Sequence, residues 1–214
     1  MSQPAPSRAS RKRIRQPRQA RSQATVAAIQ TAAARILAEG GWTALNTNLV
    51  ARRAGVSVGS VYEYFPDKTA ILDAILGQHL ADGEALIASY AGLLDQADHL
   101  EGAVELLVDG FIALHQGDPR LHRVLSSEVP LTPGQRERVH ALRSAVIGLL
   151  GDRLQGHVPA PELAATLLVD VADAVTHRWF VDEAGVPAPP DILAAELRRV
   201  LHAYLADLTS AYRS

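Results

Sequence analysis

Apolar residues recur at helical spacing from about Ser22 onward. The first stripe ends at Gly40-Gly41 and consists of Ile29, Ala33, Ile36 and Leu37. Two shorter segments follow, 47–54 and 58–64, the first closed by a glycine and the second stopped by a proline. Glycine just after a periodic segment and proline just beyond one are typical helix ends. The pattern therefore predicts three helices before residue 66, of which the last two are short.

The remainder of the chain continues as amphipathic helices separated by turn residues. Asp67 stands where an N-cap would begin a longer helix that carries Ile71, Leu72, Ile75 and Leu76 on one face. Five further helices are predicted near 101–116, 119–128, 133–155, 161–184 and 191–212, with Gly- and Pro-containing breaks between them. Runs that alternate apolar and polar residues are missing, so the expected fold is all-α with about nine helices.

Composition agrees with a helical protein that has a substantial core. Of the 214 residues 48% are hydrophobic, mostly Ala, Leu and Val, and only 5% are aromatic. There is no cysteine, which excludes disulfides and thiolate metal sites. The basic N-terminus lacks the apolar stretch of a signal peptide, and no run of about 18 apolar residues occurs. These features predict a soluble, cytoplasmic protein without a membrane partner.

Charge is divided unevenly along the chain. Residues 1–68 carry eleven Lys and Arg against three acids, and the rest of the chain carries ten against twenty. Seven of the positive side chains lie in residues 1–21, which contain no acid. Such a segment cannot bury enough apolar surface to fold alone, so we expect a disordered basic arm that reaches DNA. The open alternative is a charged leader that never settles on DNA.

Two short helices joined through Gly55-Val56-Ser57 have the dimensions of a helix-turn-helix. Gly55 permits the positive φ that ends the first helix, and Ser57 is a good N-cap for the second. Gly59 lets the backbone of the second helix approach DNA closely. Two apolar positions are expected to face the core, Val61 and Phe65. This arrangement predicts DNA recognition in the major groove.

The stretch from Thr47 to Lys68 reads TNLVARRAGVSVGSVYEYFPDK and resembles the DNA-binding signature of the TetR family of transcriptional regulators. The resemblance covers roughly residues 22–76, and the remaining two thirds agree only in length and helical character. It implies a three-helix helix-turn-helix domain fused to a larger helical domain that binds an effector and dimerises. The expected division is a disordered basic arm at 1–21, a DNA-binding domain at 22–68 and an effector-binding and dimerisation domain at 69–214.

The resemblance also implies which residues contact DNA. Thr47 and Lys68 would hold phosphates at the two ends of the motif, and Asn48 would reach a base or a phosphate. The recognition helix and its cap would supply Ser57, Val58, Gly59, Ser60, Tyr62 and Tyr64, although either tyrosine could instead pack at the edge of the core. Because this helix has no Arg or Gln, bidentate readout of guanine is not available to it. Specificity would come from DNA shape, from Val58 on thymine methyls, or from the basic arm.

In the C-terminal part, the resemblance implies a homodimer formed by the last two helices. The helix near 161–184 carries the small residues Ala164, Ala165, Ala172 and Ala174. The last helix carries a stripe of large residues, namely Leu193, Leu197, Val200, Leu201, Tyr204, Leu205 and Leu208. These could form a four-helix interface between two copies. The open alternative is that both stripes lie inside the core of a single copy.

Effector-binding candidates are the large or polar side chains in otherwise aliphatic helices, namely Phe111, His115, His122, Arg123, His177, Trp179 and Phe180. For each of them a core aromatic or a surface side chain is the open alternative. The group from His177 to Phe180 is the most suggestive, because it combines hydrogen-bonding groups with aromatic surface. The eight histidines are not spaced as metal ligands, and Asp109 with His115 is a loose pair, so neither a metal site nor a cofactor is expected.

The leading hypothesis is a ligand-responsive repressor that binds a palindromic operator in double-stranded DNA as a homodimer and is released by a small-molecule effector. The alternative is a DNA-binding regulator without an effector, controlled by a protein partner or by its own abundance. An enzyme is disfavoured, because the chain lacks cysteine, glycine-rich phosphate loops, a serine-nucleophile motif and clustered carboxylates with a base.

Overall fold

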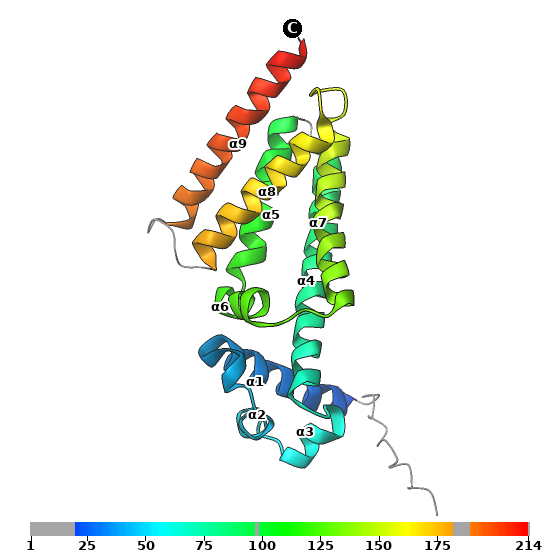
Figure 1. Ribbon diagram of the computed structural model, residues 1–214, viewed down its shortest axis with the longest axis vertical. Helices are drawn as coiled ribbons and strands as arrows, with labels where there is room; N and C mark the ends of the chain where they lie inside the picture. The colour runs from blue at the N-terminus through cyan, green and yellow to red at the C-terminus, as the bar shows by residue number, and fades with distance from the viewer. Residues whose placement is uncertain (1–19, 97–98, 182–188, 214) are drawn as a thin grey trace, which may run out of the picture. The chain divides into compact units, whose positions relative to one another are not determined.

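The computed structural model describes residues 20–96, 99–181 and 189–213, and every regular element in these ranges is a helix (Figure 1). The order is α1 Ala20–Ala44, α2 Thr47–Ala54, α3 Val58–Tyr64, α4 Lys68–Asp95, α5 Leu100–Gln116, α6 Pro119–Arg123, the π-helical turn η1 Val124–Glu128, α7 Pro133–Leu154, α8 Pro161–Phe180 and α9 Pro190–Arg213. The expected all-α fold is confirmed. No helix in the described ranges is long and apolar enough to cross a membrane.

Three helices differ from their predicted bounds by more than two residues. α1 continues past the glycine pair to Ala44, but Gly41 breaks its regularity with φ 69° and ψ −172°, a conformation that essentially only glycine adopts. The segment expected as one helix at 119–128 is a short α-helix followed by the π-helical turn η1. α8 ends at Phe180, four residues earlier than predicted, and residues 182–188 lie outside the described residues.

Sequence signals at the helix starts explain why the elements begin where they do. The Asp67 carboxylate accepts a hydrogen bond from the Ala70 amide at 2.9 Å, as the N-cap prediction required. Asp118 caps α6 in the same way, with Pro119 in the first helical turn. Thr132 and Gln135 form a reciprocal capping box at the start of α7. Local residue chemistry thus fixes these helix starts without help from distant contacts.

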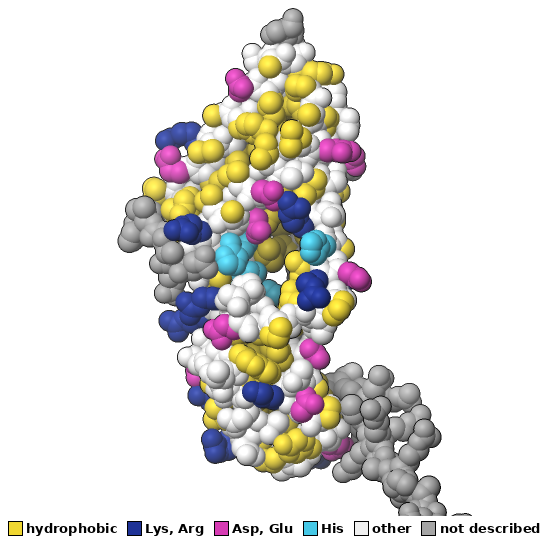
Figure 2. Space-filling view, in the orientation of Figure 1, with side chains coloured by type: hydrophobic (Ala, Val, Ile, Leu, Met, Phe, Trp, Pro, Cys, Tyr) yellow, Lys and Arg dark blue, Asp and Glu magenta, His cyan; other side chains and the backbone are white. Residues whose placement is uncertain are grey.

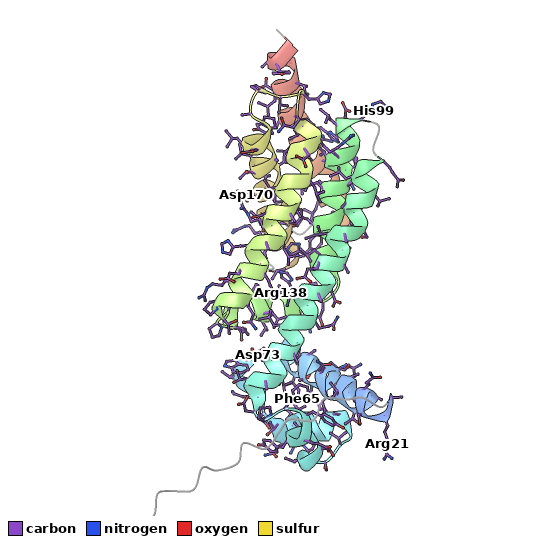
Figure 3. All side chains as sticks on the ribbon, turned by 90° about the vertical axis from the view of Figure 1, so that its right-hand side faces the viewer. Arg21, Phe65, Asp73, His99, Arg138 and Asp170 are labelled. Atoms are coloured by element: carbon purple, nitrogen blue, oxygen red, sulfur yellow. The ribbon has the colours of Figure 1, made fainter. Side chains whose placement is uncertain are left out.

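The chain forms two compact units that divide inside α4, between Ile75 and Leu76. The predicted division into domains, with a boundary after residue 68, stays a prediction. The basic arm predicted for residues 1–21 also stays a prediction, and residues 1–19 lie outside the described residues. The core of the first unit is aliphatic and includes the stripe predicted for the first helix. Its members include Ile29, Ala33, Ile36, Leu37, Leu45, Val50, Val61, Ile71 and Leu72, with Phe65 at its edge (Figure 3).

The second unit is built around α8. α8 packs against α7 and α5, and α9 packs along α5 (Figure 1). The core between these four helices includes Val104, Leu154, Leu168 and Leu201, each at most 2% exposed. α4 makes no comparably close backbone packing with any of these helices. Space is therefore left beside α4, and side chains only partly fill it.

Candidate DNA-binding surface and effector cavity

The turn between α2 and α3 has the geometry of a helix-turn-helix. Gly55 takes the left-handed conformation with φ 68° and ends α2, as predicted. The Ser57 hydroxyl oxygen accepts a hydrogen bond from the Ser60 amide at 3.0 Å and so caps α3, also as predicted. Asn46, which the sequence interpretation missed, caps α2 through the Leu49 amide at 2.8 Å. A polar residue just before a predicted helix was the signal available for it.

The motif separates into a core face and an outward face. Val50, Val61 and Phe65 are buried, which holds α2 and α3 in place. Most of the predicted DNA-contacting residues are exposed, and these are Asn48, Ser57, Val58, Gly59 and Tyr62. The others are half-buried, and these are Thr47, Ser60, Tyr64 and Lys68.

Two of the half-buried residues are held by side-chain contacts within the first unit. The Thr47 hydroxyl lies 3.1 Å from the hydroxyl of Tyr62, whose side chain is 52% exposed, and this hydrogen bond joins the start of α2 to α3. The Lys68 ammonium lies 4.1 Å from the ring centroid of Trp42, a cation–π contact that steadies a flexible cation. Trp42 escaped the sequence interpretation, although a lone tryptophan beside a glycine pair was a usable signal.

Neither packing within the described residues nor the backbone conformation requires a glycine at position 59. A Cβ built on it would meet the Ser57 Oγ at 3.7 Å, an ordinary van der Waals distance, and its φ is not positive. It is exposed, and glycine weakens a helix by about 0.5–1 kcal/mol relative to alanine. An outside surface that approaches the α3 backbone would explain the missing side chain.

A cavity of about 410 Å³ lies in the second unit beside α4. In the space-filling view a hollow with a hydrophobic floor has histidine side chains around it (Figure 2). Aliphatic residues of α4, α5 and α7 form most of its wall, including Leu80, Ile87, Leu106, Leu107, Leu142 and Leu149. The volume falls within the range of small-molecule sites, about 300–1,000 Å³.

Four histidines from four helices meet at this cavity: His79 of α4, His115 of α5, His122 of α6 and His177 of α8. The His122 ring centroid lies 5.0 Å from that of His79, 4.8 Å from that of His115 and 5.6 Å from that of His177. His79 Nε2 and His122 Nδ1 are hydrogen-bonded at 3.1 Å. Sequence spacing could not reveal this group, because its members lie up to 98 residues apart in a chain that brings four helices together.

Burial keeps three of these imidazoles neutral. It lowers the pKa of His79, although Asp82 and Asp118 oppose the shift. Burial also lowers the pKa of His115, against the hydrogen bond to the Phe111 carbonyl and the charge of Asp173. The pKa of His122 falls to about 3, through burial first and then through the neighbouring histidines. In the described part of the chain, no three His, Cys, Asp or Glu side chains are placed to hold a metal ion.

The structure brings four of the seven effector candidates together at the cavity, namely Phe111, His115, His122 and His177. Arg123, Trp179 and Phe180 do not line it, and Trp179 packs against the core of the second unit. The group from His177 to Phe180 therefore does not act as one cluster, because successive helical residues point in different directions. Asp109 pairs with Arg198 rather than with His115.

The sequence interpretation missed four polar residues of the wall: His79, Ser126, Arg143 and Asp173. His79 follows Leu76 by three positions on the apolar stripe of α4, and this spacing was a usable signal. Ser126 and Arg143 each have a polar neighbour in the sequence. Asp173 lies between two alanines, but the sequence does not show which face of its helix lines a cavity.

The two stripes proposed for a dimer interface lie mainly inside the second unit. Ala164, Ala165 and Ala172 are buried, and so are Leu197, Leu201 and Leu205, which agrees with the alternative of an internal core. Other apolar side chains of α8 and α9 remain exposed, and these are Leu163, Leu167, Ile192 and Val200.

Comparison with known proteins identifies the family. Residues 29–75 match the model of bacterial regulatory proteins of the tetR family. Residues 100–205 match the model of the tetracyclin repressor-like C-terminal domain. The chain belongs to the TetR family. Members of this family are non-enzymatic DNA-binding proteins, so the chain is a DNA-binding transcriptional regulator.

Individual relatives are more distant. The nucleoid occlusion factor SlmA of Glaesserella parasuis serovar 5 (strain SH0165) is 27% identical over 88 residues, 41% of the regulator and 42% of SlmA, so the match spans less than half of that relative. FadR of Bacillus subtilis, solved in complex with stearoyl-CoA, is 19% identical with a TM-score of 0.62, covering 82% of the regulator and 96% of FadR. NalD, the secondary repressor of the MexAB-OprM multidrug efflux pump in Pseudomonas aeruginosa, is 24% identical with a TM-score of 0.63, covering 85% and 96%. Both structures share the fold.

The lowered histidine pKa values predict a loss of stability in mild acid. Below a pH of about 6.5, His122 is protonated in the unfolded chain but stays neutral in the folded one. The free energy of unfolding therefore falls as the pH is lowered. A His122→Phe variant should remove roughly 1.4 kcal/mol of the loss between pH 7.5 and pH 5.5. Denaturant melts at the two pH values measure this, with the exposed His140→Phe as the matched control. Equal pH dependence in the wild type and His122→Phe would contradict the prediction.

Proposed function

We propose that the regulator is a ligand-responsive repressor: as a homodimer it binds a palindromic operator through α2 and α3, and a small molecule in the α4 cavity releases it. The observation that carries the proposal is the apolar cavity of about 410 Å³ with polar groups on its wall, in the same chain as a helix-turn-helix. Two proteins of the same fold support it. NalD is a repressor, and FadR was solved with stearoyl-CoA.

The outward face of the motif supports the DNA-binding residues that the resemblance implied. Asn48 and Tyr62 offer polar groups, and exposed Val58 offers an apolar contact for thymine methyls. Thr47 and Lys68 are each steadied by a neighbour, which lowers the entropy that they would lose on binding phosphate. The hydrogen bond between Thr47 and Tyr62 favours a position of the Tyr62 ring on the DNA-facing side rather than in the core.

Gly59→Ala should separate DNA affinity from folding. The variant should fold and be no less stable, because its Cβ meets nothing closer than 3.7 Å in the described chain. Operator affinity should fall about tenfold or more if the α3 backbone lies against DNA. The measurement is fluorescence anisotropy with a duplex that the full chain selects from a random library. Gly77→Ala on α4 is the matched control, because open space surrounds its Cβ. Wild-type affinity in Gly59→Ala would exclude a close approach of the α3 backbone.

The cavity wall offers a direct test of ligand release. Gly83 is buried on α4, and a Cβ there would lie 3.9 Å from the Cδ1 atoms of Leu114 and Leu142. The first carbon of a leucine would therefore fit, and the rest would extend into the cavity. Gly77→Leu places the same side chain on the same helix away from the cavity wall and serves as the matched control.

Gly83→Leu should bind the neutral fluorescent probe N-phenyl-1-naphthylamine at least about tenfold more weakly than the wild type and Gly77→Leu. The probe should lower operator affinity in the wild type and in Gly77→Leu, but not in Gly83→Leu. Fluorescence titration and anisotropy give the two quantities. If bound probe leaves the operator affinity of the wild type unchanged, control by a protein partner or by abundance is favoured instead.

Exposed apolar side chains on α8 and α9 support the homodimer. Leu163 is 61% exposed and Val200 is 57% exposed, and large exposed aliphatic residues on adjacent helices are typical of protein–protein interfaces. A second copy would cover them by a two-fold arrangement that presents two recognition helices to the two halves of a palindrome.

Leu167→Glu should convert the dimer to a monomer, because the interface would then bury an unpaired charge. Light scattering coupled to size exclusion at micromolar concentration measures the mass. Leu93→Glu is the control, since Leu93 is also exposed (49%) but lies on α4. The proposed interface fails if Leu167→Glu keeps the mass of a dimer or if the wild type is a monomer.

A further inference from the structure

We infer that the cavity takes an apolar ligand whose polar end donates a hydrogen bond, such as an alcohol, a phenol or a protonated amine, and that it discriminates against the same apolar body ending in a carboxylate. The inference rests on the proposed function, in which this cavity holds the effector. It specifies the head group that the polar wall recognises.

Polar and apolar residues of the wall are segregated along the cavity. The histidines come from the first half of α4, from the C-terminal ends of α5 and α8, and from α6. The second half of α4 and the first half of α5 supply apolar or aromatic side chains, among them Tyr90, Leu94, Leu106 and Leu107. At about 1.5 Å rise per residue, the wall from Leu76 to Leu94 extends over roughly 27 Å. An elongated ligand with a single polar end matches this division.

At the polar end two hydrogen-bond acceptors face each other. His115 Nδ1 lies 2.7 Å from the Phe111 carbonyl oxygen, and because a carbonyl only accepts, Nδ1 carries the proton and donates it. Nε2 of the neutral ring therefore presents a lone pair. Asp173 Oδ1 lies 3.7 Å from this Nε2 and also only accepts. A ligand that brings a proton to this pair gains a hydrogen bond that a carboxylate cannot form.

Three of the four cavity histidines carry no positive charge that could pair with an anionic ligand. Burial lowers the pKa of His79, His115 and His122, so these rings are neutral at pH 7 and offer no cation to an acidic ligand. His115 is only 1% exposed, so solvent does little to relieve the acceptor on its Nε2. An anion placed here would lose its hydration without gaining an ion pair.

Three carboxylates act on the histidines of the polar end. Asp82 and Asp118 act on His79, and Asp173 acts on His115. Arg143 is the one Lys or Arg among the described residues of the cavity wall. It donates through Nε and Nη2 to Asp170 on the neighbouring helix, so its charge is already balanced. A donor head group therefore meets the Asp173 carboxylate and the His115 lone pair, and a carboxylate head group meets the like charge of Asp173.

Three probes with one apolar body test the inference: decan-1-ol, decylamine and decanoate, titrated into the full-length regulator at pH 7.5 by calorimetry. We expect decan-1-ol or decylamine to bind at least about tenfold more tightly than decanoate. Comparison of the first two probes shows whether the favoured donor is a hydroxyl or an ammonium group. Competition with N-phenyl-1-naphthylamine confirms that each probe occupies the cavity.

Asp173→Asn tests the cause. It removes the charge beside His115 while keeping the shape of the side chain, so binding of decanoate should strengthen and its disadvantage against decan-1-ol should narrow several-fold. Asp109→Asn is the control, because Asp109 lies outside the cavity wall and its partner Arg198 keeps an ion pair with Glu105. The ratio between the two probes should be unchanged in that variant.

The outcomes separate this inference from the proposed function. If decanoate binds as tightly as decan-1-ol and still releases the operator, the donor rule is wrong and the ligand-responsive repressor stands. If none of the three probes binds, the donor rule is also overturned. If the alcohol or the amine binds preferentially but leaves operator affinity unchanged, the head-group inference holds and ligand release fails.

Discussion

Incomplete packing of α4 against its neighbours is the constraint on which the rest of the second unit depends. α5, α7, α8 and α9 share a dense aliphatic core, whereas α4 turns leucines toward a cavity of about 410 Å³. Side chains that line a void lose dispersion contacts on one side, so the empty state is less favourable than a filled one. Under the proposed function, the cavity that weakens the unit is also the place where a molecule of the right shape would bind.

One helix contributes residues to both units. α4 buries Ile71 and Leu72 in the core of the DNA-binding unit and lines the cavity of the second unit with residues from Leu76 onward. A ligand can shift the regulator between states only by its difference in affinity for them. A molecule that fills the space beside α4 binds the two states with different affinity if α4 is placed differently in the DNA-bound state. In the inferred head-group preference, the neutral histidines would add chemical selectivity to this packing effect.

Local residue chemistry allowed the helix bounds of the helix-turn-helix to be predicted from the sequence. Gly55, Ser57 and Pro66 act on their own neighbours, so the bounds of α2 and α3 were predicted to the residue. The cavity is different, because its wall is assembled by tertiary packing. Phe111 and His115 stood out in an aliphatic helix and were found, whereas Asp173 was not, since nothing near it in the sequence marks an acid that faces another helix. Trp179 was predicted to bind the effector because it is an unusual residue in its helix, but it packs against the core.

Ligand release requires that occupation of the cavity opposes operator binding, and thermodynamic reciprocity makes this measurable from the side of the ligand. The dissociation constant of N-phenyl-1-naphthylamine would be measured by fluorescence titration for the free regulator and for the regulator saturated with its selected operator. We expect the probe to bind the DNA complex more weakly, by the same factor by which saturating probe weakens operator affinity. Equal affinity of the probe for free and DNA-bound regulator would contradict it.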